Sequence, residues 1–239
     1  MPSFKTLSTE FISKHIYFTA RKDAYETPDG KVVDPYFVVE LPVSVCAMAI
    51  TENNEVLMVE QYRHPIGKKI LELPGGFVDE GEAPQQAIAR ELMEETGYSF
   101  ESFHYLGQTA ANPGVLNNFT HLFLAIGGKK VAEQSLDSNE EIAIHFKSLG
   151  EARQLLLENK VEQAMHALCM FYSFDFLEKS GGGVDPFDGA KAPGFFCSFH
   201  PRPEGRGNSN TTNIALFFSA NSPRKKKLLR AESTVYFKI

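Results

Sequence analysis

Three glutamates stand close together in the first half of the chain, in a spacing that allows metal chemistry. Glu91, Glu94 and Glu95 lie in the segment GFVDEGEAPQQAIARELMEETGY, which covers residues 76–98. On a helix that advances about 100° per residue, these side chains form one stripe beside an apolar face. Three like charges repel one another, and a divalent cation such as Mg²⁺, Mn²⁺ or Ca²⁺ would relieve that repulsion. A solvated acidic face is the alternative interpretation.

A helix that would position these carboxylates is predicted over residues 84–96. Proline opens it, where the missing backbone N–H costs little, and Gly97 follows its last residue. Arg90 lies four residues before Glu94, so the two side chains are expected to pair. The arc expected to face the core consists of Ile88, Ala89, Leu92, Met93 and Thr96.

The same segment matches a known pattern at every defined position. The pattern is G-x5-E-x7-R-E-U-x-E-E-x-G-U, where U is apolar, and it is filled by Gly76, Glu82, Arg90, Glu91, Leu92, Glu94, Glu95, Gly97 and Tyr98. In these residues the chain resembles the Nudix hydrolases, with Tyr98 as the one loose match. The resemblance implies an α+β fold: a Nudix-type α/β/α sandwich with a mixed sheet and an N-terminal β-ribbon or small antiparallel sheet.

The resemblance also implies roles for the acidic residues. Glu91 and Glu95 match the main ligands of a catalytic Mg²⁺, for which Mn²⁺ can substitute, and Glu82 matches a loop glutamate that joins them. Glu94 matches a further ligand or the general base, and Glu95 is a second candidate for catalysis.

Arginine and glycine positions of the motif carry implied roles as well. Arg90 would orient the carboxylates by ion pairing, although an ordinary salt bridge is the alternative. Gly75 would place its carbonyl on the metal, and Gly76 would let the substrate approach the backbone closely. A plain turn is the alternative for both glycines.

Three features outside the motif resemble the ADP-ribose pyrophosphatase branch of the family. Arg63, in Gln-Tyr-Arg, matches an arginine that reaches the substrate phosphates, and Pro113 matches a proline placed 15 residues past the motif. Glu140 or Glu141, in Asn-Glu-Glu-Ile, matches a loop that supplies a further ligand or base. A surface charge, a turn and a solvated acidic loop are the respective alternatives.

The resemblance implies Mg²⁺-dependent hydrolysis of a nucleoside diphosphate linked to another group, with ADP-ribose giving AMP and ribose 5-phosphate as the leading case. The alternatives are another nucleoside-diphosphate sugar, a dinucleoside polyphosphate, an oxidised nucleotide, or binding of a nucleotide without catalysis. The chain lacks tryptophan, so adenine would stack on Tyr25, Tyr36 or Phe37. Relatives of this branch often dimerise through N-terminal strands, which implies a homodimer here.

Apolar runs and turn residues outline the remaining organisation. Three parts are expected: N-terminal strands over 1–42, a Nudix hydrolase domain over 43–178, and a Gly/Pro-rich, basic, disordered tail over 179–239. Beyond the helix over 84–96, the pattern predicts strands over 15–24, 36–41, 43–51, 55–62, 69–73, 102–109, 121–126 and 139–146, and helices over 149–159 and 163–177.

Composition and charge restrict the expected partners and cellular location of the protein. The chain has 239 residues with a net charge of −6, and its basic excess lies in the tail. An acidic body does not suit duplex nucleic acid, whose binding depends on Lys and Arg. Three scattered cysteines and the lack of a long apolar run favour a cytoplasmic protein without a membrane span. Within the tail, 214–218 is a possible strand and 224–227 a basic patch that suits an acidic partner, nuclear import or plain solvation.

Overall fold

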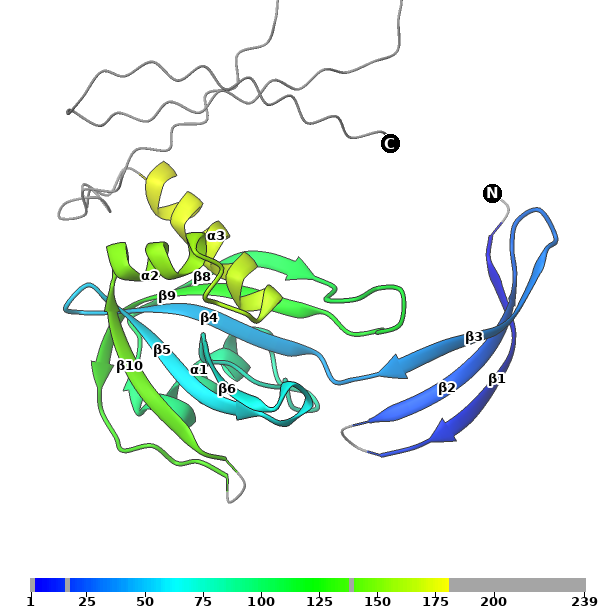
Figure 1. Ribbon diagram of the computed structural model, residues 1–239, viewed down its shortest axis with the longest axis horizontal. Coiled ribbons are helices and arrows are strands. Elements are labelled where there is room, and N and C mark those ends of the chain that lie inside the picture. Colours follow the sequence, from blue (N-terminus) through cyan, green and yellow to red (C-terminus); the bar gives the residue numbers. More distant parts are fainter. Residues whose placement is uncertain (1–2, 16–17, 138–139, 181–239) are drawn as a thin grey trace, which may run out of the picture. The chain divides into compact units, whose positions relative to one another are not determined.

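The computed structural model describes residues 3–15, 18–137 and 140–180. These residues form two β-sheets and three α-helices (Figure 1). The elements in chain order are β1 (Lys5–Ser13), β2 (Thr19–Glu26), β3 (Val32–Glu40), β4 (Ser44–Thr51), β5 (Glu55–Arg63), the 3₁₀ turn η1 (His64–Ile66), β6 (Lys68–Glu72), α1 (Pro84–Thr96), β7 (Tyr98–Ser99), β8 (Ser102–Thr109), β9 (Thr120–Lys130), β10 (Ile142–Ser148), α2 (Leu149–Leu157) and α3 (Ala164–Lys179).

The first three strands form a small antiparallel sheet, which confirms the expected N-terminal element. The turn between β2 and β3 is the Pro-Asp-Gly turn, in which Gly30 donates its N–H to Thr27 O at 2.9 Å and has a φ of +83°. The predicted strand over 15–24 is shifted, since β2 begins at Thr19. The sequence analysis also missed β1, because all its residues are exposed and no buried face marks it in the sequence.

The larger sheet has seven strands and is mixed. Its central order is β10-β5-β4-β9-β7, with β6 paired to β5 and β8 paired to β9. β4 and β9 run parallel, with Ala47 opposite Phe123, and the other pairs are antiparallel. The predicted strand over 139–146 is corrected to β10, which begins at Ile142, and the two-residue strand β7 was not predicted.

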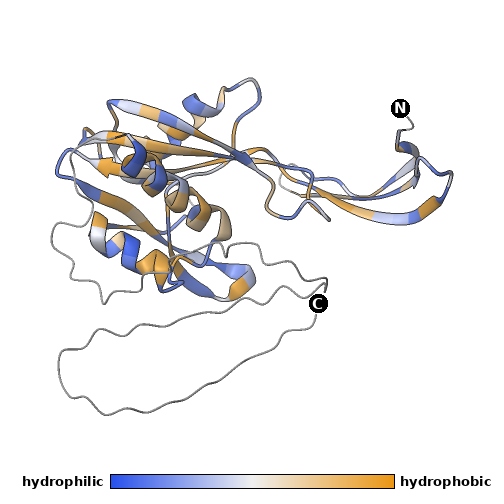
Figure 2. Cartoon of the chain, turned by 90° about the horizontal axis from the view of Figure 1, so that it is seen from above, coloured by the Kyte–Doolittle hydropathy of each residue, from blue (hydrophilic) through white to orange (hydrophobic). Residues whose placement is uncertain are grey.

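Helices cover both faces of the larger sheet. Alternate residues of a strand point to opposite faces, so β4 contributes to two separate cores. Val45 and Ala47 pack with α1, whereas Cys46 and Met48 pack with α2 and α3. Burial on both sides explains why 45–50 is a continuous apolar run. Figure 2 shows this pattern: the strands of this sheet are largely hydrophobic, and the helices alternate between hydrophobic and hydrophilic residues.

The boundaries predicted for α1 are confirmed, but the buried face is not the predicted one. Gly97 ends the helix with a φ of +74°, and a Cβ there would overlap the backbone of Ala132. The buried residues of α1 are Ala87, Ile88, Leu92, Glu95 and Thr96. Ala89 and Met93 are only partly buried, so the face is rotated toward the carboxylate stripe. The reason is a tertiary contact: Glu95 packs against the loop after β6.

The last two helices lie close to their predicted ranges. Ser148 caps α2 by accepting a hydrogen bond from Glu151 N, while the Glu151 side chain accepts from Ser148 N. α3 continues to Lys179, one residue beyond the expected end of the Nudix domain. Residues 181–239 of the predicted tail, including the possible strand and the basic patch, lie outside the described residues. No helix in the described ranges is long and apolar enough to span a bilayer.

Candidate active site

Two glutamates of α1 face a glycine pair in the loop between β6 and α1. Gly75 donates its N–H to Glu95 Oε2 at 3.0 Å, and the Glu95 side chain is almost fully buried. A Cβ on Gly76 would overlap the Glu91 carboxylate, and a Cβ on Gly75 would overlap the backbone of Val45. Glycine is therefore required at Gly75, where backbone lies in the way, whereas a side chain at Gly76 would displace the Glu91 carboxylate.

Arg90 gathers the remaining acidic residues of the motif. Its guanidinium donates to Glu82 at 3.0 and 3.1 Å, to Glu91 Oε1 at 2.9 Å and to Glu94 Oε2 at 3.0 Å. It also donates to Phe77 O at 2.9 Å. These contacts lower the pKa of Glu82 and raise the pKa of Arg90, chiefly through the hydrogen bonds between the two side chains. The five contacts place Arg90 as the fixed centre around which the acidic side chains are ordered.

Burial makes the two central carboxylates hard to ionise without a cation. It raises the pKa of Glu95 to about 8, and the charges of Glu91 and Glu140 add to this effect. The hydrogen bond from Gly75 and the charge of Arg63 oppose it. The pKa of Glu91 is also raised, again mainly by burial, against the opposing influence of Arg90. Two adjacent carboxylates that resist ionisation form a donor set that a divalent cation would stabilise.

The donor set fits Mg²⁺ better than a cation that needs a full shell of protein ligands. Within the described residues, no three Asp, Glu, His or Cys side chains are gathered closely enough to hold a metal by themselves. Mg²⁺ keeps several waters and is commonly held by one or two carboxylates together with substrate phosphates. Glu91 and Glu95 supply such a pair, and the backbone of Gly75 and Gly76 packs directly against them.

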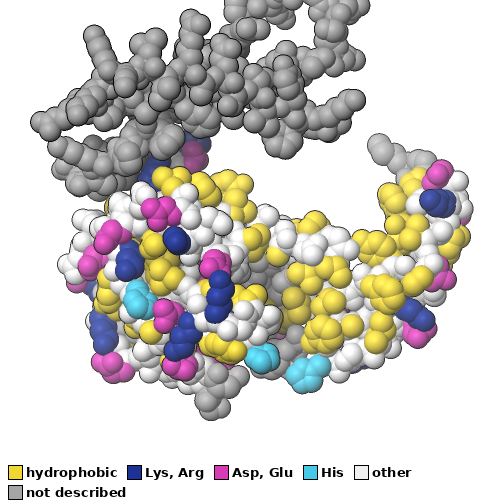
Figure 3. All heavy atoms as spheres, in the orientation of Figure 1, with side chains coloured by type: hydrophobic (Ala, Val, Ile, Leu, Met, Phe, Trp, Pro, Cys, Tyr) yellow, Lys and Arg dark blue, Asp and Glu magenta, His cyan; other side chains and the backbone are white. Residues whose placement is uncertain are grey.

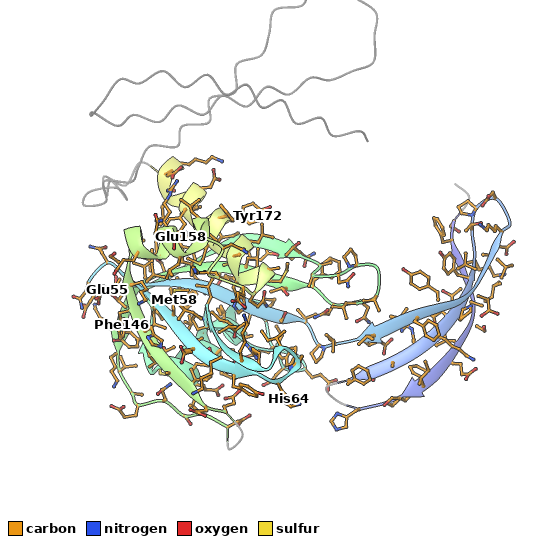
Figure 4. All side chains as sticks on the ribbon, viewed as in Figure 1. Glu55, Met58, His64, Phe146, Glu158 and Tyr172 are labelled. Carbon is orange, nitrogen blue, oxygen red and sulfur yellow. The ribbon has the colours of Figure 1, made fainter. Side chains whose placement is uncertain are left out.

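Arg63, at the end of β5, has a buried partner that the sequence analysis missed. Its Nε donates to Glu72 Oε2 at 2.8 Å, and Glu72 is only 1% exposed. Glu72 Oε1 is buried and has no hydrogen-bond partner, and burial raises the pKa of this carboxyl despite the charge of Arg63. The signal in the sequence was an acidic residue at the end of a short apolar strand. Next to Arg63, His64 is exposed at the start of η1 (Figure 4).

The two candidate glutamates before β10 differ in their surroundings. Glu141 is highly exposed, and its carboxylate accepts a hydrogen bond from Lys69 Nζ at 2.6 Å. Glu140 instead raises the pKa of both Glu91 and Glu95 through its charge, so it belongs electrostatically to the carboxylate site. Asn139, from the same predicted loop, lies outside the described residues.

Pro113 lies in a loop that contacts the small N-terminal sheet. Within that loop Gly114 O accepts a hydrogen bond from Tyr36 Oη at 2.8 Å, and Val115 O accepts one from Val39 N at 2.8 Å. On the sheet, a pocket of about 350 Å³ is lined by Phe4, Thr6, Asp23, Tyr25, Tyr36 and Val38. The rings of Tyr25 and Tyr36 meet edge to face at 5.6 Å. The residue after Pro113 thus contacts a side chain of this aromatic pocket.

Comparison with known proteins agrees with this architecture. The NUDIX domain model matches residues 40–168, and a model described as the nucleoside diphosphate sugar hydrolase N-terminal domain matches residues 4–39. The chain is 35% identical over 169 residues to the methanol dehydrogenase activator of Bacillus methanolicus, covering 70% of this chain and 91% of that one. It is 30% identical over 174 residues to the ADP-ribose pyrophosphatase of Bacillus subtilis, covering 70% and 94%.

A mammalian relative and a solved structure extend the comparison. The mouse ADP-sugar pyrophosphatase is 35% identical over 126 residues, which cover 48% of this chain and 57% of that one. A crystal structure of an ADP compounds hydrolase superposes with a TM-score of 0.66 at 19% identity, over 74% of this chain and 96% of the other, so the fold is shared. With the domain match and the geometry of the motif together, the chain belongs to the Nudix family.

Proposed function

We propose that this protein is a Mg²⁺-dependent hydrolase that cleaves the pyrophosphate of ADP-ribose into AMP and ribose 5-phosphate. The observation that carries the proposal is the packing of Glu91 and Glu95 against the Gly75–Gly76 loop. Relatives that are ADP-ribose or ADP-sugar pyrophosphatases support the choice of substrate. Mn²⁺ is expected to replace Mg²⁺, because both are hard cations that suit carboxylate oxygens.

The residues would divide the work between holding the metal, binding the phosphates and accepting a proton. Glu91, Glu95 and the Gly75 carbonyl would hold the metal, with Glu82 as a further oxygen donor. Bound Mg²⁺ supplies charge neutralisation of the pyrophosphate and a lowered pKa for an attacking water.

Arg63 would bind a phosphate oxygen, since Glu72 holds its guanidinium in place and its charge acts on Glu95. Glu94, Glu95 or Glu140 would accept the proton as water attacks phosphorus, and Glu141 remains an alternative. The water oxygen ends on one of the two phosphate monoesters.

The N-terminal sheet would bind the nucleobase. Its pocket offers the faces of Phe4, Tyr25 and Tyr36 for stacking, in place of the missing tryptophan. Asp23 lines the same pocket, and its Oδ1 is buried without a partner, so it could accept a hydrogen bond from an exocyclic amine. The Pro113 loop would connect this pocket to the larger sheet.

The same sheet would mediate a homodimer. Apolar side chains are exposed on it in unusual number, including Phe4, Leu7, Phe11, Ile12, Val32 and Phe37. Figure 3 shows apolar side chains gathered over this sheet. Surfaces of this kind mark interaction sites. We further propose a cytoplasmic location, because Cys46 and Cys169 are free thiols buried within one core, as a reducing compartment allows.

A substrate panel tests the proposed function. We would compare kcat/KM for ADP-ribose, a GDP-sugar, a UDP-sugar, a dinucleoside tetraphosphate and an oxidised nucleoside triphosphate, all with Mg²⁺. The proposal expects the highest kcat/KM for ADP-ribose. A higher value for another compound would keep the chemistry and reassign the substrate. Calorimetric binding of ADP-ribose without turnover of any compound would favour a non-catalytic binding module.

A further inference from the structure

A histidine far from the motif contacts the loop that carries the glycine pair. His166 lies in the first turn of α3 and is 6% exposed. Its Nδ1 accepts a hydrogen bond from the backbone N–H of Leu73 at 3.2 Å, across 93 residues of sequence. Nδ1 must therefore carry no proton, which leaves the ring hydrogen on Nε2. Burial lowers the pKa of His166 to about 3, with a further contribution from the charge of Arg63, so the ring is neutral.

The segment that His166 contacts is fixed on its other side by β4. Pro74 O accepts from Ala47 N at 3.1 Å, and Gly76 O accepts from Val45 N at 2.8 Å. β4 therefore holds the carbonyls of this segment, while α3 holds its first N–H. The segment is thus held on one side by a central strand of the larger sheet and on the other by α3.

The two residues that flank this hydrogen bond both lead into the site. Glu72, directly before Leu73, is the partner of Arg63. Gly75, two residues after it, donates to Glu95. A rotation of the peptide between Glu72 and Leu73 would therefore shift the phosphate-binding arginine and the buried carboxylate together.

We propose that His166 is a positioning residue for the reaction, because its neutral ring fixes the Leu73 peptide and thereby sets Arg63 and Glu95 in their working geometry. This inference rests on the proposed function. Packing alone does not require histidine, because its neighbours on α3, Cys169 and Met170, fill the same core with apolar or weakly polar groups. A histidine with a specific acceptor is needed only to satisfy a backbone N–H that is otherwise buried.

Two isosteric substitutions separate this role from a general effect on packing. His166→Asn places an amide oxygen near the position of Nδ1, whereas His166→Gln places it near the position of Nε2. His166→Leu removes the acceptor. Met170→Ala is the matched control, because it opens a cavity in the same helix and leaves the hydrogen bond in place. Each variant would be assayed for ADP-ribose hydrolysis with Mg²⁺ at a fixed interval below its own Tm.

The expected result has two parts. Hydrogen exchange of the Leu73 amide, followed by NMR on the full chain, should accelerate in His166→Gln and His166→Leu and stay slow in His166→Asn and Met170→Ala. In the first two variants kcat should fall by about ten- to hundredfold, since small displacements of catalytic groups have effects of that size. His166→Asn should keep most of the wild-type kcat, although its stability is reduced.

Three outcomes would each refute a different claim: the hydrogen bond to Leu73, its positioning role, or the proposed function. Slow exchange of the Leu73 amide in His166→Leu would show that this amide is not protected by a hydrogen bond to His166. Fast exchange with a wild-type kcat in the same variant would show that the bond does not position the site. Absence of AMP release by the wild-type chain would instead refute the proposed function, and the catalytic role of His166 with it.

Discussion

The backbone nitrogen of Gly75 lies 3.0 Å from Oε2 of Glu95, so the glycine loop donates a hydrogen bond to the most buried carboxylate of α1. This contact joins the residue just before the motif to a glutamate near its end, 20 residues further along the sequence. It also opposes the effect of burial on the pKa of Glu95, yet burial prevails and the pKa is raised to about 8. The site therefore holds a proton at neutral pH that metal binding would displace.

Glu95 should make the metal-free protein less stable as the pH rises. Its folded pKa of about 8 exceeds the ordinary value of 4.5, so the folded chain retains a proton that the unfolded chain releases. The stabilisation from this group is complete below about pH 4.5 and is lost as the pH rises through about 8. Glu95→Gln removes this titration. We expect the Tm measured in EDTA to fall less steeply with pH in the variant than in the wild-type chain, over the range from about pH 5 to about pH 8. If Tm varied with pH in the same way in the wild-type chain and in Glu95→Gln, the raised pKa of Glu95 would be contradicted.

Variants of Arg63 and Glu72 should distinguish an effect on the free energy of unfolding from an effect on substrate binding. Arg63→Ala leaves a buried carboxylate without its partner, which costs about 1–3 kcal/mol of unfolding free energy. Arg63→Ala with Glu72→Gln should recover most of that loss, because no buried charge remains. Both variants should still show KM for ADP-ribose raised at least about tenfold, the value of one charge-assisted hydrogen bond. Denaturant titration and steady-state kinetics give the two quantities, and a double variant with wild-type KM would exclude Arg63 from phosphate binding.

The site shows how far sequence reasoning reaches and where it stops. The ends of α1 follow from Pro84 and Gly97, whose effects are local. The prediction of the buried face of α1 was wrong. Glu95 is buried because it contacts Gly75, and the helical period does not indicate this contact. The metal and phosphate roles proposed for Glu91, Glu95 and Arg63 come from the family resemblance, since the spacing of these residues alone also fits a solvated surface.

Partners distant in sequence were the second kind of omission. Glu72 pairs with Arg63 nine residues away, and His166 contacts Leu73 across 93 residues. Neither Glu72 nor His166 belongs to a recognisable sequence motif. Their contacts with Arg63 and Leu73 are therefore seen only in the folded structure. The strand β1 was missed for the opposite reason, because it buries nothing within the chain.

Exposed apolar residues of β1 should control the oligomeric state. Phe11→Glu places a charge at a position that is 45% exposed on the proposed dimer surface. We expect light scattering to show a shift from dimer toward monomer, because a charge is costly to bury in an interface. Leu157→Glu on α2, at a position 63% exposed, is the control and should leave the mass unchanged. A wild-type chain that is monomeric and active would remove the dimer proposal.

The tail beyond α3 should be dispensable for catalysis. α3 ends at Lys179, whose Nζ pairs with Asp175 Oδ2 at 2.7 Å, and residues up to Leu177 build the two hydrophobic cores of the described part of the chain. A chain that stops at Ser180 should therefore keep the kcat and KM of the full chain for ADP-ribose. A large fall in kcat, at unchanged Tm, would show that residues of the tail contribute to the site.

The most direct test follows AMP release from ADP-ribose by chromatography, using the full chain and its Glu95→Gln variant with and without Mg²⁺. We expect the wild-type chain to release AMP only with Mg²⁺, and the rate to fall by about a hundredfold or more in the variant, because a metal ligand or general base is lost. Hydrolysis by Glu95→Gln at the wild-type rate would contradict the assignment of the site. No release by the wild-type chain at any Mg²⁺ concentration would contradict the proposed substrate.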